Sequence, residues 1–323
     1  MMSHTGESLA SEERSVGEAF IAAFGPARVR RGVSLAPMTT FKTGGAADWF
    51  LETAAPGDIV RAVRACREVG LPLTVLGSGS NVLVGGRGVR GLVVRMWHGR
   101  VATLGPGVVR ADAGLSLNGL VRWTVNHGLA GLERWAGMPG TVGGALCGNA
   151  HFRGTLIGDQ VLAVDVVDGE GSVRQLDSEA MGFGYDTSRL QTTDEVALSA
   201  TFSVTLGAEG ALRAIARESL SYRKQTQPLT ARSAGCIFQN PDPAVDDIPV
   251  GIPPSAGELI DRAGLKGRRA GHAQVSLVHG NFIVSDGRAS PGEIRDLIEG
   301  CRETVRDHFG ITLRDEIIYR GEF

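Results

Sequence analysis

The chain has 323 residues, of which 42% are hydrophobic and 21% charged, the composition of a globular protein of about two domains. Its 33 basic and 35 acidic residues leave a net charge of −2, and no basic run is interleaved with aromatic residues, so nucleic acid is not an expected partner. No apolar run reaches the ~18 residues of a membrane helix, and the polar N-terminus lacks the apolar core of a secretory signal, so we expect a cytoplasmic protein that binds no membrane.

Helix and strand patterns alternate along most of the chain. In chain order, we expect a polar tail at 1–14, helices at 16–24, 56–69 and 116–127, and strands at 73–76, 91–96, 161–167 and 196–205. Such alternation indicates an α/β or α+β protein rather than a solenoid or a β-sandwich.

The best-defined element is the last helix. Ser290 and Glu293 form a capping box, Pro291 suits the first turn, and Gly310 is a suitable end. The apolar residues after Gly310 then alternate over 311–319, which predicts a strand with Glu316 on its polar face.

The four cysteines are Cys66, Cys147, Cys236 and Cys301, and they are widely separated. Their spacing matches no common metal-binding pattern, so we expect free thiols and no metal site.

Two glycine-rich loops can hold a phosphate-containing cofactor. The first is Gly77-Ser78-Gly79-Ser80-Asn81, directly after a predicted strand, and the second is Pro139-Gly140-Thr141-Val142-Gly143-Gly144. Glycine lets the backbone approach a ligand closely and turn its N–H groups toward phosphate oxygens. Neither loop matches the dinucleotide fingerprint, since Val82 stands at its third glycine position, and neither is a P-loop. Each loop taken alone is more simply an ordinary tight turn, because the chain has 46 glycines.

Further motifs stand before, between, around and after the loops in a fixed order. They are Thr40-Phe41-Lys42-Thr43-Gly44-Gly45, Gly131-Leu132-Glu133, Met138 to Ala145, Arg223 with Thr226-Gln227-Pro228, Ser233 to Pro241, Ala256 to Ile260, Ala263 to Gly267, Ala273 to Ser276, and Phe309 to Ile317. Together with the loops they resemble the UDP-N-acetylenolpyruvoylglucosamine reductase (UDP-N-acetylmuramate dehydrogenase) family, from about Leu35 to Tyr319.

The resemblance implies an α+β fold. A FAD-binding domain of the vanillyl-alcohol-oxidase type would occupy 35–208 in two lobes, 35–97 and 98–208, after a tail and helix at 1–34. A substrate domain would occupy 209–323. The short step from Tyr185 to the next helix indicates the shorter branch of the family, which lacks a tyrosine-bearing insertion. The first loop contains no histidine, so the FAD would be bound non-covalently.

The implied reaction reduces FAD with NADPH, then transfers a hydride to C3 of an enolpyruvyl UDP-sugar while a side chain protonates C2. FAD would lie on Gly77, Ser78, Gly79, Ser80, Asn81, Pro139, Gly140, Thr141, Gly143, Gly144 and Asn149. The substrate would contact Arg223, Asn240, Tyr185 and His279, although a lone histidine is more often structural.

Cys236 and Glu316 occupy the positions of the family's proton donor and catalytic glutamate. Serine is the usual donor, and a thiol is a stronger acid than an alcohol. Judged from residue type alone, Cys236 would be a small buried hydrophobe, as most free cysteines are, and Glu316 a solvated surface residue.

One position departs from the family pattern. Asp186 stands where the family has an arginine that helps to stabilise the enolate. We expect Asp186 and Arg189 to pair at i and i+3 of a helical turn, with Arg189 supplying the missing positive charge. Arg134 and Arg153 are alternative sources.

Two other functions stay open at this point. A flavin oxidase of the same broad fold would be reduced by an alcohol instead of NADPH. A non-catalytic relative would bind flavin or a UDP-sugar without turnover, and the replacement at Asp186 keeps that possibility open.

Overall fold

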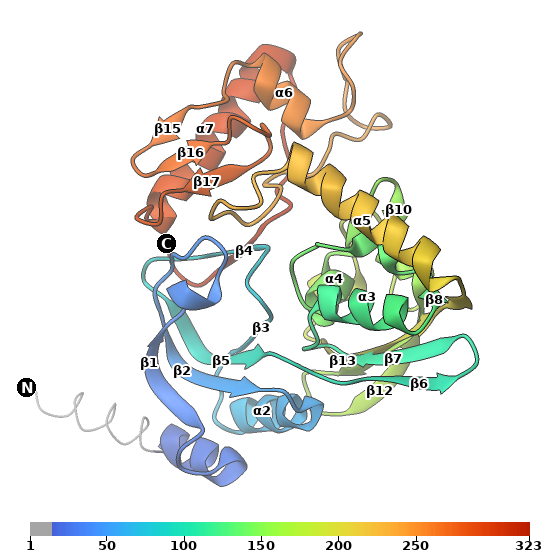
Figure 1. Cartoon of the computed structure of the whole chain (residues 1–323). Helices are drawn as coiled ribbons and strands as arrows, with labels where there is room; N and C mark the ends of the chain where they lie inside the picture. The colour runs from blue at the N-terminus through green and yellow to red at the C-terminus, as the bar shows by residue number, and fades with distance from the viewer. Residues whose placement is uncertain (1–14) are drawn as a thin grey trace, which may run out of the picture.

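The computed structural model describes residues 15–323, so the tail expected at 1–14 lies outside the described residues. The expected helix near residue 16 is present over 15–24. In Figure 1 two lobes lie side by side, and the C-terminal elements lie above them. Within the described part of the chain, no helix has the length and apolar character needed to cross a bilayer.

The first lobe is a four-stranded sheet in the order β1 (Val29–Ser34), β2 (Ala46–Thr53), β5 (Val89–Met96) and β3 (Leu73–Leu76). The last three strands are parallel, and β1 is antiparallel to β2. Helix α2 (Pro56–Glu68) crosses from β2 to β3 and packs its apolar face against the sheet. The first glycine loop therefore leaves the carboxyl end of β3, as the sequence predicts.

The second lobe is a five-stranded antiparallel sheet with helices on one side (Figure 1). Its strand order is β12 (Val173–Asp177), β11 (Val161–Val167), β13 (Val196–Ser203), β7 (Val108–Asp112) and β6 (Val101–Gly105). The covering helices are α3 (Leu117–Asn126), capped by Ser116, and the short α4 (Val142–Cys147), capped by Thr141. The second glycine loop runs into α4.

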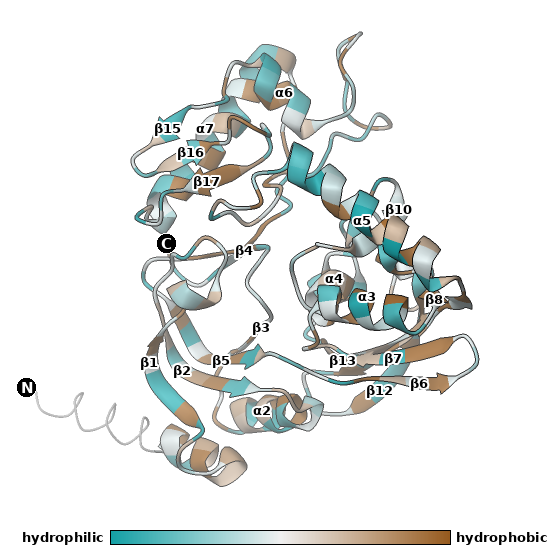
Figure 2. Cartoon of the chain, in the orientation of Figure 1, coloured by the Kyte–Doolittle hydropathy of each residue, from teal (hydrophilic) through white to brown (hydrophobic). Residues whose placement is uncertain are grey.

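Helix α5 (Glu209–Thr226) connects the second lobe to the C-terminal elements. Figure 2 shows hydrophobic residues near its start and a hydrophilic end close to Thr226. Leu212 belongs to the same core as α3 and Trp135, so the beginning of the helix packs on the second lobe. The domain boundary at 209 stays a prediction: α5 begins there, and its first turn still packs on the preceding lobe.

The C-terminal elements form a separate core. Helices α6 (Ala256–Arg262) and α7 (Pro291–Phe309) pack against a small antiparallel sheet of β15 (Arg269–Ala270), β16 (Ala273–Val275) and β17 (Ile283–Ser285). Helix α7 carries the predicted capping box, and Gly310 ends it in a left-handed conformation with φ 73°. The predictions for this helix are confirmed.

The predicted strand over 311–319 is wrong in extent. Only β18 (Ile318–Arg320) is a regular strand, and it pairs in parallel with β4 (Val82–Val84) of the first lobe. The preceding segment is extended, with Ile311, Leu313 and Ile317 buried, but it forms only one isolated bridge, between Asp315 and Phe238. Its apolar alternation therefore reflects burial against the C-terminal core and not membership of a sheet.

The remaining elements are short. They are η1 (Ala36–Met38), β8 (Leu129–Ala130), η2 (Glu133–Trp135), β9 (His151–Phe152), β10 (Thr155–Leu156), η3 (Ile157–Gln160), η4 (Arg189–Gln191) and β14 (Thr205–Leu206). The β18–β4 pairing matters more for the site, because it brings Glu316 back to the first glycine loop.

Candidate active site

The two glycine loops meet in space. A Cβ atom on Gly77 would lie 2.4 Å from Oγ1 of Thr141, and one on Gly140 would lie 3.4 Å from Oγ of Ser80. Gly79 has φ 63° and lies so close to the backbone of Met38 that a Cβ would come within 2.4 Å of its carbonyl oxygen. The glycines are therefore needed for close backbone packing as well as for turning.

The loops carry backbone N–H groups that no part of the described chain uses. None of the amides of residues 77–81 donates to a protein acceptor in residues 15–323, and neither does the amide of Gly140. By contrast, Gly143 donates to Ala113, and Gly144 donates to Oγ1 of Thr141. Unused amides on glycine-rich backbone are the donor set that phosphate oxygens require, so the first loop and Gly140 fit the pyrophosphate of FAD.

Three residues that were predicted to bind the cofactor have side chains that hydrogen-bond within the protein itself. Asn149 is fully buried; its Nδ2 donates to the carbonyl of Gly184, and its Oδ1 accepts from the amide of Gly158. Asn81 donates from Nδ2 to the carbonyl of Glu316, 3.0 Å away. Thr141 caps α4. These side chains hold the loops in place, and their backbones remain candidates for cofactor contacts.

Cys236 and Glu316 lie on neighbouring segments. The amide of Glu316 donates to the carbonyl of Ile237, the residue after Cys236, at 2.8 Å. Asn281 fixes the same segment, since it accepts from the amide of Phe238 and donates to its carbonyl. The segments that carry the two proposed catalytic side chains are thus held together by a backbone hydrogen bond from Glu316, just before β18, and by the side chain of Asn281, just before β17.

Burial raises the pKa of the Cys236 thiol well above its usual value, and the carboxylates of Glu316 and Asp186 raise it further. Burial also raises the pKa of Glu316 well above its usual value, with Asp186 adding to the effect. Both shifts stabilise the protonated form of the group, which suits proton donation.

Arg223 is the arginine whose positive charge acts on the Cys236 thiol. It comes from the last turn of α5, is 7% exposed, and stacks over the ring of Phe152 with its carbon Cζ 5.6 Å from the ring centroid. Its charge lowers the pKa of Cys236, and its buried Nε has no hydrogen-bond partner. A buried guanidinium with an unused donor is suited to an anionic ligand.

Tyr185 and Asn240 lie at the edge of this region. Asn240 donates from Nδ2 to the Tyr185 hydroxyl at 3.1 Å, and its Oδ1 accepts from the amide of Ala256 at the start of α6. Burial, followed by the charge of Asp186, raises the pKa of Tyr185 to about 12, so the phenol stays protonated. The pair links the flavin lobe to the C-terminal core.

His279 has structural contacts instead. Its Nδ1 accepts from the amide of Asn281, and its ring packs against Phe282 and Gly257. Burial lowers its pKa, as does Lys266, so the ring is neutral. These contacts give His279 a structural role, which is to support Asn281.

Comparison with known proteins shows to which family the chain belongs. Residues 227–319 match the family model described as UDP-N-acetylenolpyruvoylglucosamine reductase, C-terminal domain, and residues 47–177 match an FAD binding domain. The UDP-N-acetylenolpyruvoylglucosamine reductase of Heliobacterium modesticaldum is 38% identical over 287 residues, 88% of each chain. The chain belongs to this reductase family.

Other members of the reductase family give the same result. UDP-N-acetylenolpyruvoylglucosamine reductase 2 of Symbiobacterium thermophilum is 37% identical over 294 residues, 90% of this chain and 92% of the relative. The crystal structure of the Thermus caldophilus reductase matches with a TM-score of 0.76 at 32% identity, covering 91% of this chain and 99% of that one. The predicted α+β fold with an FAD-binding domain is confirmed.

The predicted pair of Asp186 and Arg189 is wrong. Residues 185–189 form no helical turn, because Asp186 has φ 53° and Gly184 bridges Thr187. Arg189 instead donates from Nε to the buried carboxylate of Glu195 at 2.6 Å, where Arg174 is a second partner. Arg189 is therefore committed to stabilising a buried carboxylate, and its predicted catalytic role loses its structural support.

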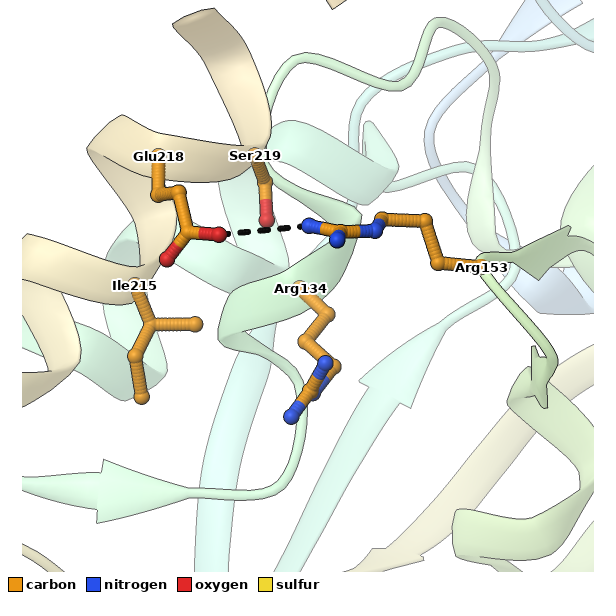
Figure 3. Close-up of a pocket in the computed structure, with 5 residues that line it drawn as sticks. All are labelled: Arg134, Arg153, Ile215, Glu218 and Ser219. Atoms are coloured by element: carbon orange, nitrogen blue, oxygen red, sulfur yellow. Dashed lines mark hydrogen bonds and ion pairs between the residues drawn. The ribbon is translucent and has the colours of Figure 1, made fainter. Parts of the chain in front are cut away.

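The alternative arginines lie elsewhere. Arg134 and Arg153 line a pocket of about 270 Å³ against α5, and Figure 3 shows Arg153 directed at Glu218. Arg153 lies 3.2 Å from that carboxylate and its Cζ is 5.1 Å from the centre of the Tyr222 ring. The positive charge of Arg153 is thus partly neutralised by Glu218 of α5.

Sequence reasoning missed His151. This residue lies in β9, and its Nε2 is 3.1 Å from Oδ1 of Asp186. Its ring also packs on Tyr185, with centroids 4.8 Å apart. The only available signal was its position just after the second glycine loop, because the contact spans 35 residues of sequence.

Proposed function

We propose that this chain reduces UDP-N-acetylglucosamine enolpyruvate to UDP-N-acetylmuramate, a peptidoglycan precursor, with NADPH as the source of the hydride. The observation that carries the proposal is the convergence of a protonated thiol, Cys236, with Glu316, which the backbone ties to Asn81 of the first glycine loop. Its family membership over 88% of the chain supports the same reaction.

The two loops would hold FAD non-covalently, and the bound cofactor would supply the hydride chemistry between NADPH and C3 of the enolpyruvyl group. The protein supplies binding and orientation. The free amides of residues 77–81 and of Gly140 bind phosphate oxygens, and the contact between Gly77 and Thr141 keeps the loops in register. Acid or heat should release free FAD from the yellow protein.

Cys236 delivers the proton to C2. Its raised pKa keeps the thiol protonated until the substrate carbon becomes basic, and geometry fixed by Asn281 and Ile237 holds the sulfur in place. Glu316, also with a raised pKa, orients or replenishes that proton. Arg223 offers its unpartnered Nε to an anionic part of the substrate, while Tyr185 and Asn240 contact the sugar nucleotide from the domain border.

The deciding experiment separates the two half-reactions in the purified holoprotein. NADPH mixed anaerobically with the enzyme should bleach the flavin, and the enolpyruvyl substrate should restore its colour, with UDP-N-acetylmuramate as the product. Bleaching by alcohols but not by NADPH would establish the oxidase instead. Bound flavin that neither NADPH nor an alcohol reduces would establish a non-catalytic binder.

A further inference from the structure

Three side chains that can bind a cation converge beside Cys236. Ligand atoms of His151, Asp186 and Glu316 all lie within 4.8 Å of one another, and the residues come from three distant segments. Among residues 15–323 this is the only such group of three or more histidine, cysteine, aspartate or glutamate side chains. The cluster is therefore particular to this site, and acidic residues elsewhere in the described part of the chain form no similar group.

The Asp186 carboxylate is the strongest sign that the group is incomplete. Its side chain is only 6% exposed. Oδ1 faces Nε2 of His151 at 3.1 Å, but Oδ2 is buried and has no hydrogen-bond partner. A buried carboxylate oxygen without a partner carries the full cost of its lost hydration, so native proteins normally supply a hydrogen-bond donor or a cation for it.

Backbone features position each of the three residues. His151 begins the tight hairpin of β9 and β10, whose turn residues Arg153 and Gly154 have φ 50° and 80°, as a two-residue turn of this kind requires. Asp186 is held at φ 53°, a conformation that aspartate tolerates better than most side chains. Asn81 fixes the carbonyl of Glu316.

Charge makes the arrangement unfavourable for an anionic substrate. Asp186 and Glu316 place two carboxylates together, and the proposed substrate brings a carboxylate and a diphosphate. Arg223 supplies one nearby positive charge, which acts on Cys236 against the opposing effect of both carboxyl groups. A divalent cation between the two carboxyl groups would displace the proton that burial favours on Glu316, offset the negative charge and give Oδ2 of Asp186 its partner. Glu316 would then orient the proton of Cys236 and not replenish it.

We propose that His151, Asp186 and Glu316 bind a divalent transition-metal cation of the Zn²⁺ or Mn²⁺ class, which in turn receives the substrate carboxylate. One imidazole and two carboxylates suit these ions better than Mg²⁺, which prefers oxygen ligands alone. Ligand atoms on one such ion at ~2.0–2.2 Å from the metal lie at most ~4.4 Å apart, so small side-chain rotations close the site.

Three protein ligands leave at least one coordination position open, as in catalytic metal sites. The second half of the proposal, that the substrate carboxylate fills this position, rests on the proposed function. Bound there, the carboxylate would have its growing negative charge stabilised as the hydride reaches C3 and Cys236 protonates C2. The first half, metal binding, stands without any turnover.

The binding test uses the FAD-loaded protein stripped with a chelator and then titrated calorimetrically with Zn²⁺, Mn²⁺ and Mg²⁺, with bound metal counted by elemental analysis. We expect one equivalent of Zn²⁺ or Mn²⁺ per chain and much weaker Mg²⁺ binding. Asp186→Asn and His151→Ala should each weaken binding by at least ~10-fold. The matched control is His272→Ala, because His272 also pairs with an aspartate, at 2.9 Å, but lies in no such cluster.

The result that overturns the proposal is equally direct. Equal binding in Asp186→Asn, His151→Ala and the His272→Ala control would show an adventitious ion only. Absence of binding in the unmodified protein would mean that Asp186 and Glu316 share a proton instead of a metal.

A kinetic readout tests the substrate half. Chelation should raise the KM for the enolpyruvyl substrate by about tenfold or more, restored by Zn²⁺ or Mn²⁺, while flavin reduction by NADPH stays unchanged. Asp186→Arg should abolish metal binding and make turnover insensitive to chelator, because the guanidinium supplies a permanent charge. Metal binding without any turnover would refute the proposed function but leave the metal site standing, whereas chelator-insensitive turnover would refute the metal's role with the substrate.

Discussion

Replacing Gly77 by alanine should destabilise the protein through a single contact. The new Cβ would lie 2.4 Å from Oγ1 of Thr141, about 0.6–1 Å closer than ordinary packing allows. Thr141 must then move, and because its hydroxyl accepts from the amide of Gly144, α4 loses its cap. Overpacking costs about 1–3 kcal/mol and a lost cap about 1 kcal/mol, so we expect about 3 kcal/mol in total.

A double-mutant cycle isolates the cause. Thr141→Ala alone should cost about 1 kcal/mol for the cap. In Gly77→Ala/Thr141→Ala the clashing oxygen is gone and the nearest remaining contact is 3.4 Å, so the double variant should be about as stable as Thr141→Ala. The two changes would then be strongly non-additive.

The assay is urea unfolding of each variant without added FAD, followed by circular dichroism. Gly86→Ala is the matched control, since a Cβ there meets nothing within 4 Å. Gly77→Ala behaving like Gly86→Ala, or costs that simply add in the double variant, would refute the reasoning.

Further substitutions test the other assignments. Cys236→Ala should slow flavin reoxidation by substrate ~10²–10⁴-fold while leaving reduction by NADPH intact, and Cys236→Ser should restore part of the rate; normal turnover of the alanine variant would make the thiol mere packing. Arg189→Ala should lower the midpoint of thermal unfolding but barely change turnover, and a severe kinetic loss would contradict its pairing with Glu195. Burial opposes ionisation of Glu195, yet hydrogen bonds from Arg189, Arg174 and Thr193 lower its pKa overall, so its stabilisation is complete above its usual pKa of 4.5 and is lost as the pH falls toward the lowered folded value. Unfolding free energies from pH about 6 to about 3.5 should therefore decline less in Glu195→Gln than in the unmodified protein, and parallel curves would exclude Glu195 as a source of that decline.

The sequence by itself determined the local elements and the nucleotide-type loops. Helical spacing and capping residues were sufficient for α2, α3 and α7, because these depend on neighbours three or four positions apart. The ordered motifs also singled out Cys236 and Glu316 as a catalytic pair. The structure brings these two residues onto adjacent segments. Short-range patterns carry this information because helix, cap and turn energies are local.

Only the tertiary structure decided which charged side chains pair with each other. Asp186 and Arg189 look like a helical pair in the sequence, but the left-handed backbone at Asp186 directs the carboxylate to His151, and Arg189 turns to Glu195. Likewise, the apolar alternation after Gly310 predicted a strand that exists only from Ile318, where β4 offers a partner. Pairing partners and positive φ angles follow from packing across the whole chain, so nothing in the local pattern could specify them.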